Sequence, residues 1–388
     1  MKAAARIFGI AVLAALAASP AASYDFGLSL TNTPKYLGEE FSYTLAASPW
    51  FSLLPGPKLD LYLSGMAEMV ADEEETDFRF DLGRTQVVYR PRPGMTAEAG
   101  RLSVSDTAGL VMSGLYDGVR FSSFAPFGRI TLGGYYTGLL NKERAGIVIS
   151  RADAADASSE DEYFAPRRAV AAAGFDVPAA GVGLDLIGQF DLREGDEGVH
   201  TQYAALRFSR GFLQTFSLRL AGVGAVAQVE GGDSELSYAV DGELGWFIPS
   251  ILSDRLYVGA LSGSAGSGDL TAYMPIKGPS AGKVFSPEVA GFTVLRAGYF
   301  LRPFETLSTD LSSRIFLSSG ADGAGDPSLD SGADELYLGT EVYASLVFAP
   351  TSEFSLILGS GIFIPNSAAF IPDTESTFLV SLAAVVSF

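Results

Sequence analysis

The chain has 388 residues, of which 48% are hydrophobic and 18% charged, and its formal net charge at pH 7 is -19. A charge of this sign argues against nucleic acid as a partner, because the phosphate backbone binds basic surfaces. The chain contains no cysteine, which excludes a disulfide framework.

Residues 1–23 have the layout of a secretory signal. Lys2 and Arg6 precede an apolar stretch from Ile7 to Ala18, and small residues end the segment. The apolar stretch is too short to cross a bilayer as a helix. We therefore expect export, with residues 1–23 removed and residues 24–388 forming the mature protein.

After the signal, segments of roughly ten residues alternate apolar with polar side chains. In one of them Leu184, Leu186 and Phe190 alternate with Asp185 and Asp191. This is the length that a tilted strand needs to cross a bilayer, and no uncharged apolar run is long enough for a transmembrane helix. Alternation alone fits either a soluble sandwich or a membrane barrel.

The connections between these segments alternate short and long. The short ones are 53–58, 90–94, 125–128, 178–181, 210–214, 248–254, 302–305 and 349–353, and the longer ones are 31–38, 71–77, 105–117, 141–168, 193–198, 230–235, 262–291, 318–334 and 366–376. Such alternation is typical of outer-membrane barrels, with short periplasmic turns and long extracellular loops. We expect an all-β fold, a single transmembrane antiparallel β-barrel of about 18 strands. The alternative is 16 strands, if a hairpin drawn at 199–220 or 254–262 is wrong.

Aromatic residues flank the short connections. They include Trp50, Tyr89, Phe124, Trp246 and Phe304. Rings at this depth are typical of the membrane–water interface. We expect a girdle that contains both tryptophans of the chain.

The polar face of the strands would line the lumen of a barrel. The charged residues on it are Arg79, Asp81, Glu98, Arg120, Arg129, Asp185, Asp191, Arg219, Asp241, Glu243, Arg296, Asp310, Arg314 and Glu341. A channel for a polyanion would carry a basic excess, whereas this lining is mixed. We expect these residues to line a pore through which small hydrophilic solutes diffuse passively, with a mild preference for cations.

The segment 97–122 resembles a region of the porin superfamily, with a Gly-Arg pair at 100–101, then the third long loop, then Asp-Gly at 117–118. In that superfamily the third loop commonly folds into the barrel and narrows it. The resemblance implies a constriction loop formed by residues that include Asp106, Leu110, Met112 and Leu115. An ordinary surface loop is the alternative.

The chain ends inside an apolar strand, one face of which carries Phe378, Val380, Leu382, Val386 and Phe388. A strand that ends the chain suggests a ring in which the last strand pairs with the first, which starts near 24–30. The terminal aromatic with alternate apolar residues also resembles the C-terminal signal by which the barrel-insertion machinery recognises outer-membrane barrels.

The strand number and the segment 334–363 resemble the 18-strand barrels of the alginate-export and outer-membrane carboxylate-channel type. The resemblance implies a bacterial outer membrane location, with membrane lipid, the insertion machinery and small hydrophilic solutes as partners. The mixed lumen argues against alginate or another polyanion. Trimers are common among porins, but no pattern in this sequence marks an interface.

Two other functions fit parts of the sequence. The long loops are acidic, so the runner-up is a barrel with a largely closed lumen whose loops bind a ligand or a surface partner. His200, the single histidine, follows Asp196 and Glu197 and is the one candidate for a hydrolase, although a lone histidine near a loop is usually structural. We therefore expect no enzyme activity and no cofactor. We also expect no metal site, because the acids of 322–335 lack the spacing of a calcium loop.

Overall fold

The computed structural model describes residues 23–72, 75–193, 198–229, 234–250, 252–266, 272–319, 329, 335–371 and 374–388. Residues 1–22 of the predicted signal lie outside this part, and the first strand begins at Ser23. Asp196, Glu197 and most of the acidic stretch 322–335 also lie outside the described residues.

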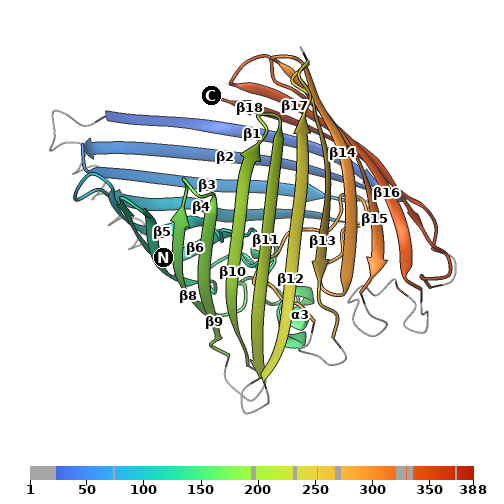
Figure 1. Cartoon of the computed structure of the whole chain (residues 1–388). Coiled ribbons are helices and arrows are strands. Elements are labelled where there is room, and N and C mark those ends of the chain that lie inside the picture. The colour runs from blue at the N-terminus through green and yellow to red at the C-terminus, as the bar shows by residue number, and fades with distance from the viewer. Residues whose placement is uncertain are drawn as a thin grey trace.

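The described chain forms one closed antiparallel sheet of 18 strands (Figure 1). The strands are β1 (Ser23–Leu37), β2 (Glu40–Gly56), β3 (Leu59–Ala71), β4 (Thr76–Tyr89), β5 (Met95–Ser105), β6 (Ser113–Ala125), β7 (Gly128–Tyr136), β8 (Arg168–Val177), β9 (Val182–Asp191), β10 (Val199–Phe212), β11 (Phe216–Val229), β12 (Ser234–Phe247), β13 (Arg255–Gly263), β14 (Phe292–Phe304), β15 (Leu307–Ser318), β16 (Tyr337–Phe348), β17 (Phe354–Pro365) and β18 (Thr377–Ser387). Two short helices, α2 (Lys142–Ala145) and α3 (Arg151–Ser158), lie between β7 and β8. Neither is long and apolar enough to cross a membrane.

The ring closes through β1, which pairs with β2 on one side and with β18 on the other. Leu30 lies opposite Val386, and the backbone of Leu28 exchanges two hydrogen bonds with Phe388. In Figure 1 the red end of the chain lies beside its blue start. The prediction of an 18-stranded barrel closed by its last strand is confirmed, and the alternative of 16 strands is wrong.

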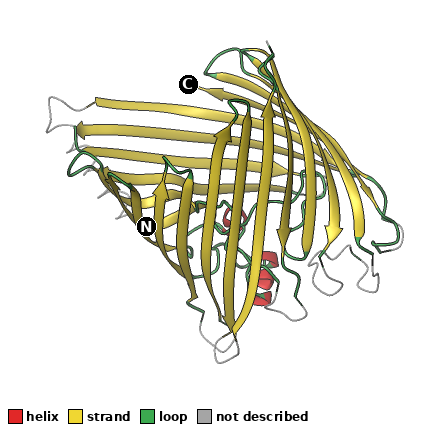
Figure 2. Cartoon of the chain, in the orientation of Figure 1, coloured by secondary structure: helices red, strands yellow, loops and turns green. Residues whose placement is uncertain are grey.

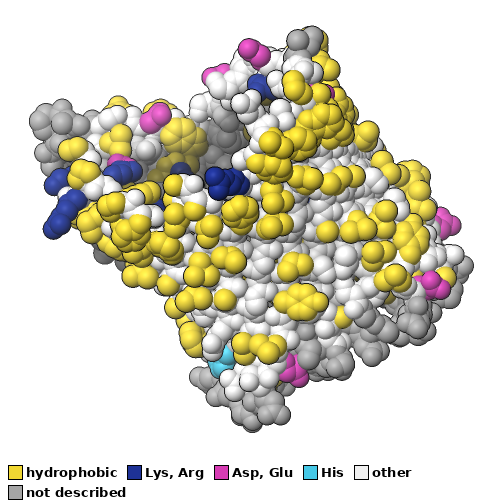
Figure 3. Space-filling model, viewed as in Figure 1, with side chains coloured by type: hydrophobic (Ala, Val, Ile, Leu, Met, Phe, Trp, Pro, Cys, Tyr) yellow, Lys and Arg dark blue, Asp and Glu magenta, His cyan; other side chains and the backbone are white. Residues whose placement is uncertain are grey.

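Alternation along each strand separates an outer apolar face from an inner polar one. On β4, Phe78 and Phe80 are 61% and 70% exposed. The alternate residues Arg79 and Asp81 form ion pairs with Glu143 and Arg144, respectively, in the β7–β8 connection. Figure 3 shows hydrophobic side chains spread over much of the outer wall. Such a wall matches the solvent properties of lipid, and because the sheet is closed, every described strand pairs with a neighbouring strand on each side.

The predicted short turns all connect strands at one end of the barrel. The prediction of a long connection at 31–38, the first in the chain, is wrong. β1 continues to Leu37 and reaches β2 through a tight turn, in which Gly38 has a φ of +62°. Thr33 and Pro34 resemble loop residues, yet both pair with β2. The β1–β18 ladder is interrupted at these two residues, so the N–H group that proline lacks is not needed for pairing with β18.

The closure can be tested with a cross-link, because the natural chain has no cysteine. The hydroxyl oxygens of Ser29 and Ser387 lie 2.8 Å apart across the β1–β18 seam. We expect the double variant S29C/S387C to form an intramolecular disulfide under mild oxidation of the folded protein, seen as a mobility shift reversed by reductant.

The matched control is S29C/S217C, which places the second cysteine on β11, far from β1 in the strand order. This control should stay unlinked. Equal cross-linking in both variants, or none in either, would contradict the seam.

Candidate functional site

The described parts of three connections fold into the barrel and pack on one another: 106–112 after β5, 137–167 after β7, and 264–266 with 272–291 after β13. The Tyr273 hydroxyl donates to the Leu110 carbonyl at 2.9 Å, and the Lys277 backbone N–H donates to the Val111 carbonyl at 3.0 Å. The Lys277 ammonium donates to the Arg144 carbonyl at 2.6 Å. Figure 2 shows these loops and both helices among the surrounding strands.

The loop 106–112 is organised by one carboxylate. Asp106 is 7% exposed and accepts hydrogen bonds from the backbone of Gly109, Val111 and Met112 at 2.8, 3.0 and 2.8 Å. Carboxylates that accept several backbone N–H groups hold a tight turn firmly. The role of Asp106 in this structure is therefore to fold the loop.

The other residues predicted for the constriction loop differ in their positions. Leu110 and Met112 are 2% and 1% exposed and belong to the apolar cluster that joins the three connections to the wall. Leu115 is not in the loop, because β6 already begins at Ser113, and it packs against that cluster from the strand.

A second carboxylate fastens the connection 264–291. Glu341 on β16 is fully buried, accepts hydrogen bonds from the backbone of Lys283, Val284 and Phe285 at 2.9, 2.7 and 3.1 Å, and forms an ion pair with Arg314. The Phe285 ring then stacks on another ring, Phe363 of β17, with centroids 4.4 Å apart. Glu341 was expected to line a pore, but its carboxylate is fully buried beneath this connection.

Most of the charged side chains predicted for the lumen are in ion pairs. The pairs are Arg79 with Asp77 and Glu143, Asp81 with Arg101 and Arg144, Glu98 with Arg120, Asp191 with Arg168, Asp241 with Arg219 and Arg296, and Glu243 with Arg255 and Arg296. Among the residues that the structure describes, most charges on the inner wall are therefore compensated by an opposite charge.

Arg314 pairs with Glu341, and the other three predicted residues lie outside these pairs. Arg129 makes no ion pair with any residue that the structure describes, and its guanidinium lies 5.8 Å from the centre of the Phe124 ring. Asp185 accepts the Thr107 backbone N–H, and Asp310 accepts the Tyr257 hydroxyl at 3.1 Å. Arg129 and Asp185 both border an internal cavity of about 360 Å³.

Sequence reasoning missed a buried network at the long-loop end. Arg168 and Asp153 are both fully buried and paired, and Asp191 and Arg193 complete the group. Asp153 lies in the first turn of α3, where it forms a capping box with Ser150. A serine followed three residues later by an acid is a visible sequence signal, but nothing in the sequence indicates the partner on β8.

The inner face of β1–β3 is the part of the wall that these connections leave uncovered. Among the described residues of these strands only Leu53 is buried, and nearly all other side chains are partly or fully exposed. On the opposite wall the inner side chains Tyr203, Ala225 and Ala239 are 3%, 3% and 0% exposed. The inner face of β1–β3 is therefore the least covered part of the described inner wall.

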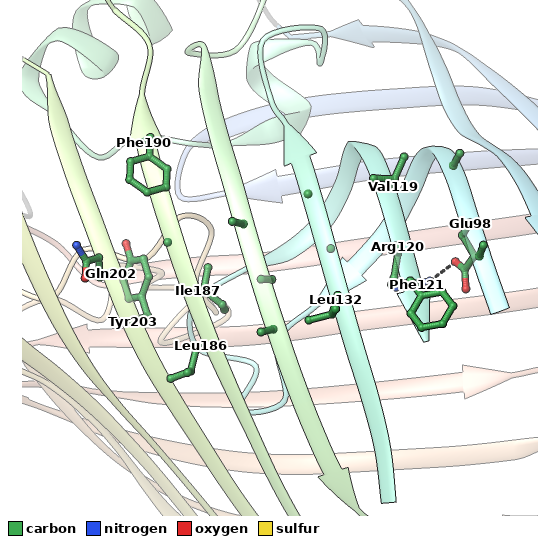
Figure 4. Close-up of a pocket in the computed structure, with 18 of the residues that line it drawn as sticks. Glu98, Val119, Arg120, Phe121, Leu132, Leu186, Ile187, Phe190, Gln202 and Tyr203 are labelled. Atoms are coloured by element: carbon green, nitrogen blue, oxygen red, sulfur yellow. Dashed lines mark hydrogen bonds and ion pairs between the residues drawn. The ribbon is translucent and has the colours of Figure 1, made fainter. Parts of the chain in front are cut away.

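A large apolar groove of about 1200 Å³ lies on the other side of the wall (Figure 4). Its lining includes Val119, Leu132 and Leu186, which are 59%, 51% and 54% exposed on the outer face. In Figure 4 the ion pair between Glu98 and Arg120 lies among these residues. The groove opens on the outer face of the wall.

The polar side chains of His200 and Lys277 each contact backbone groups of neighbouring segments. The His200 ring accepts the Asp191 backbone N–H at 3.1 Å and packs beside Phe190, so it helps to close the end of the β9–β10 pair. No group of three or more histidines, cysteines or acids in the described chain is arranged to hold a metal ion. Burial, and secondly Arg144, lowers the pKa of the Lys277 ammonium.

No family model matches the sequence, and no curated protein is similar to it. Solved structures are similar in fold. OccK1 (OpdK) of Pseudomonas aeruginosa has a TM-score of 0.63 at 12% identity, over 95% of this chain and 99% of that one. OprD of the same organism has a TM-score of 0.61 at 10% identity, over 94% and 95%.

The chain has the OprD fold. A further structure, described as the outer membrane protein OpdK from Pseudomonas aeruginosa, matches with a TM-score of 0.62 at 11% identity, over 94% of this chain and 99% of that one. The likeness covers the whole barrel, so the predicted resemblance to 18-strand outer-membrane barrels holds at the level of fold.

The anchoring role of Glu341 can be measured by proteolysis, since trypsin cleaves after Lys277 and Lys283 in the connection that it holds. Removing one partner of a buried charge network costs about 3 kcal/mol or more. We expect Glu341→Ala to raise the rate of tryptic cleavage at these sites by roughly two orders of magnitude, if cleavage follows local opening of the connection.

The control is Glu353→Ala in the exposed β16–β17 turn, which should cleave at the same rate as the natural chain. Equal rates for both variants, with the fragments identified by mass spectrometry, would show that Glu341 does not hold the connection.

Proposed function

We propose that this protein is an exported channel of the bacterial outer membrane through which small hydrophilic solutes diffuse passively. The observation that carries the proposal is the uncovered polar inner face of β1–β3 inside a closed barrel with an apolar outer wall. A closed barrel of this kind is stable in lipid, and a polar lumen is the path that it offers to solutes.

Features at both ends of the chain support this location. Residues 1–23 are proposed to be the export signal. On the last strand Phe378, Val380, Leu382 and Phe388 are 53%, 47%, 41% and 73% exposed on the outer face. These residues and Val386 are proposed to be recognised by the insertion machinery before they meet membrane lipid. The fold likeness to an outer membrane protein, OpdK, agrees with this placement.

The charged residues proposed to line the channel are those whose side chains keep some exposure: Arg79, Glu98, Arg120, Arg129, Asp185, Arg219, Glu243, Arg296, Asp310 and Arg314. Asp81, Asp191, Asp241 and Glu341 are largely buried and are proposed to position the arginines beside them. The loop 106–112 is proposed to narrow the lumen from the side of β9, where Asp185 holds Thr107.

The runner-up is a barrel with a largely closed lumen whose acidic loops bind a partner. The observation in its favour is the packed interior, in which residues of all three connections join one apolar cluster with β8–β13. The two proposals differ in whether the folded protein conducts ions.

We expect the refolded mature chain to give steady single-channel conductance in a planar bilayer. Under a salt gradient the reversal potential should show a weak preference for cations, because the inner charges are mostly paired and the loops are acidic. Protein unfolded by heating serves as the control. A silent bilayer, from protein shown to be folded by its mobility on a gel, would favour the closed-lumen alternative.

A further inference from the structure

We infer that the passage prefers neutral polyhydroxylated solutes, such as sugars and polyols, to charged ones. The inference rests on the proposed channel function and names its substrate class. It comes from the part of the inner wall that the three connections leave open, which differs in chemistry from the charged wall opposite.

The open wall is lined by hydroxyl groups. The strand registers place on its inner face Ser29, Thr31 and Thr33 of β1, Ser42, Thr44, Ser48 and Ser52 of β2, Ser64 of β3, and Ser381 and Ser387 of β18. The inner side is fixed by Leu37 and Leu379, which lie opposite each other at the seam and pack against the interior cluster. We call this surface the hydroxyl wall.

The charged residues on the inner face of the hydroxyl wall are Asp25 and Lys35 on β1, Glu40 on β2, and Asp60 and Glu68 on β3, and four of these five are acids. On β5–β16, by contrast, arginines and acids form repeated ion pairs. A wall of hydroxyls exchanges hydrogen bonds with a neutral polyol in either direction, because each hydroxyl both donates and accepts.

Two aromatic rings lie on the same face near the β2–β3 turn. Trp50 lies opposite Ser64 and Gly27, so its indole is on the inner face and not in the outer girdle where it was expected. Its ring and that of Tyr62 are nearly parallel, with centroids 6.3 Å apart and an angle of 11° between planes. The second tryptophan, Trp246, does lie on the outer face, stacked on Phe216.

The two rings are held in place by their neighbours. A Cβ atom at Gly27 would lie 2.7 Å from the indole, so the glycine gives the Trp50 ring room to lie close against the wall. The Arg84 guanidinium lies 4.0 Å from the centre of the Tyr62 ring, in cation–π geometry. Rigid rings beside a row of hydroxyls form a path that is apolar in places and hydrogen-bonding in others.

This combination matches the surface of a sugar. A pyranose has faces of C–H groups, which pack on aromatic rings, and an edge of hydroxyls, which need exchangeable hydrogen-bond partners. A conducting path needs contacts that are favourable enough for entry and weak enough for release, and single stacking contacts have that strength. A carboxylate would find few free cations along this wall.

The test is single-channel recording with neutral oligosaccharides and with mono- and dicarboxylates of similar size added to the bath. We expect the oligosaccharides to interrupt the current in a concentration-dependent way, and the carboxylates to do so less. Trp50→Ala should weaken the sugar block by about tenfold while leaving the conductance in salt alone nearly unchanged.

Phe247→Ala removes an aromatic ring from the charged wall, beside Arg255, and serves as the matched control, because it should leave the sugar block unchanged. Trp50→Phe keeps a ring, should retain most of the block, and covers the case in which Trp50→Ala folds poorly. Conductance without any sugar block, or a stronger block by carboxylates, would overturn this inference and leave the channel function standing. Absence of conductance would overturn the channel function itself.

Discussion

The structure depends on one constraint, which is that every backbone N–H and C=O group within lipid must be paired inside the protein. The chain meets it by joining β18 to β1, so that every described strand has a neighbouring strand on each side. The other features of the barrel follow from this ring. Its strands alternate because the two faces meet different surroundings, and the seam includes the backbone hydrogen bonds between Leu28 and Phe388.

The ring by itself would enclose a wide space, and the loops determine how much of it stays open. Two carboxylates, Asp106 and Glu341, each collect several backbone N–H groups and so turn flexible connections into fixed parts of the interior. Because both carboxylates are buried, their negative charge is stabilised by hydrogen bonds from groups of the protein itself. Arginines and acids elsewhere on the inner wall compensate one another in the same way, whereas the hydroxyl wall carries a row of serines and threonines.

Local periodicity predicted most of the fold, because an alternating strand between two short turns has few other solutions. It failed at Thr33 and Pro34, whose loop-like character hid a strand that faces a polar lumen and lacks one neighbour at that point. It also failed for Trp50, since depth in the membrane predicts an aromatic ring but not the face on which the ring lies.

The interior was less predictable than the wall. The strand pattern placed Glu341 on the inner face. Its partners, however, are backbone N–H groups of residues 283–285, and no pattern of residue types in the sequence identifies them. Arg168 and Asp153 meet because a helix lies at the long-loop end, again without a sequence signal for the pairing. Contacts between distant loops depend on the assembled ring, and local patterns cannot supply them.

The central claim is that solutes pass along β1–β3 and not along the wall beneath the loops. It is tested most directly by charged thiol reagents applied to the conducting channel, because the natural chain has no cysteine. The cysteine of Ser48→Cys lies on the hydroxyl wall. The cysteine of Ala225→Cys lies on β11, on the wall beneath the loops, where Ala225 is 3% exposed. The account predicts a stepwise fall in current for Ser48→Cys and no change for Ala225→Cys. The opposite pattern would contradict it.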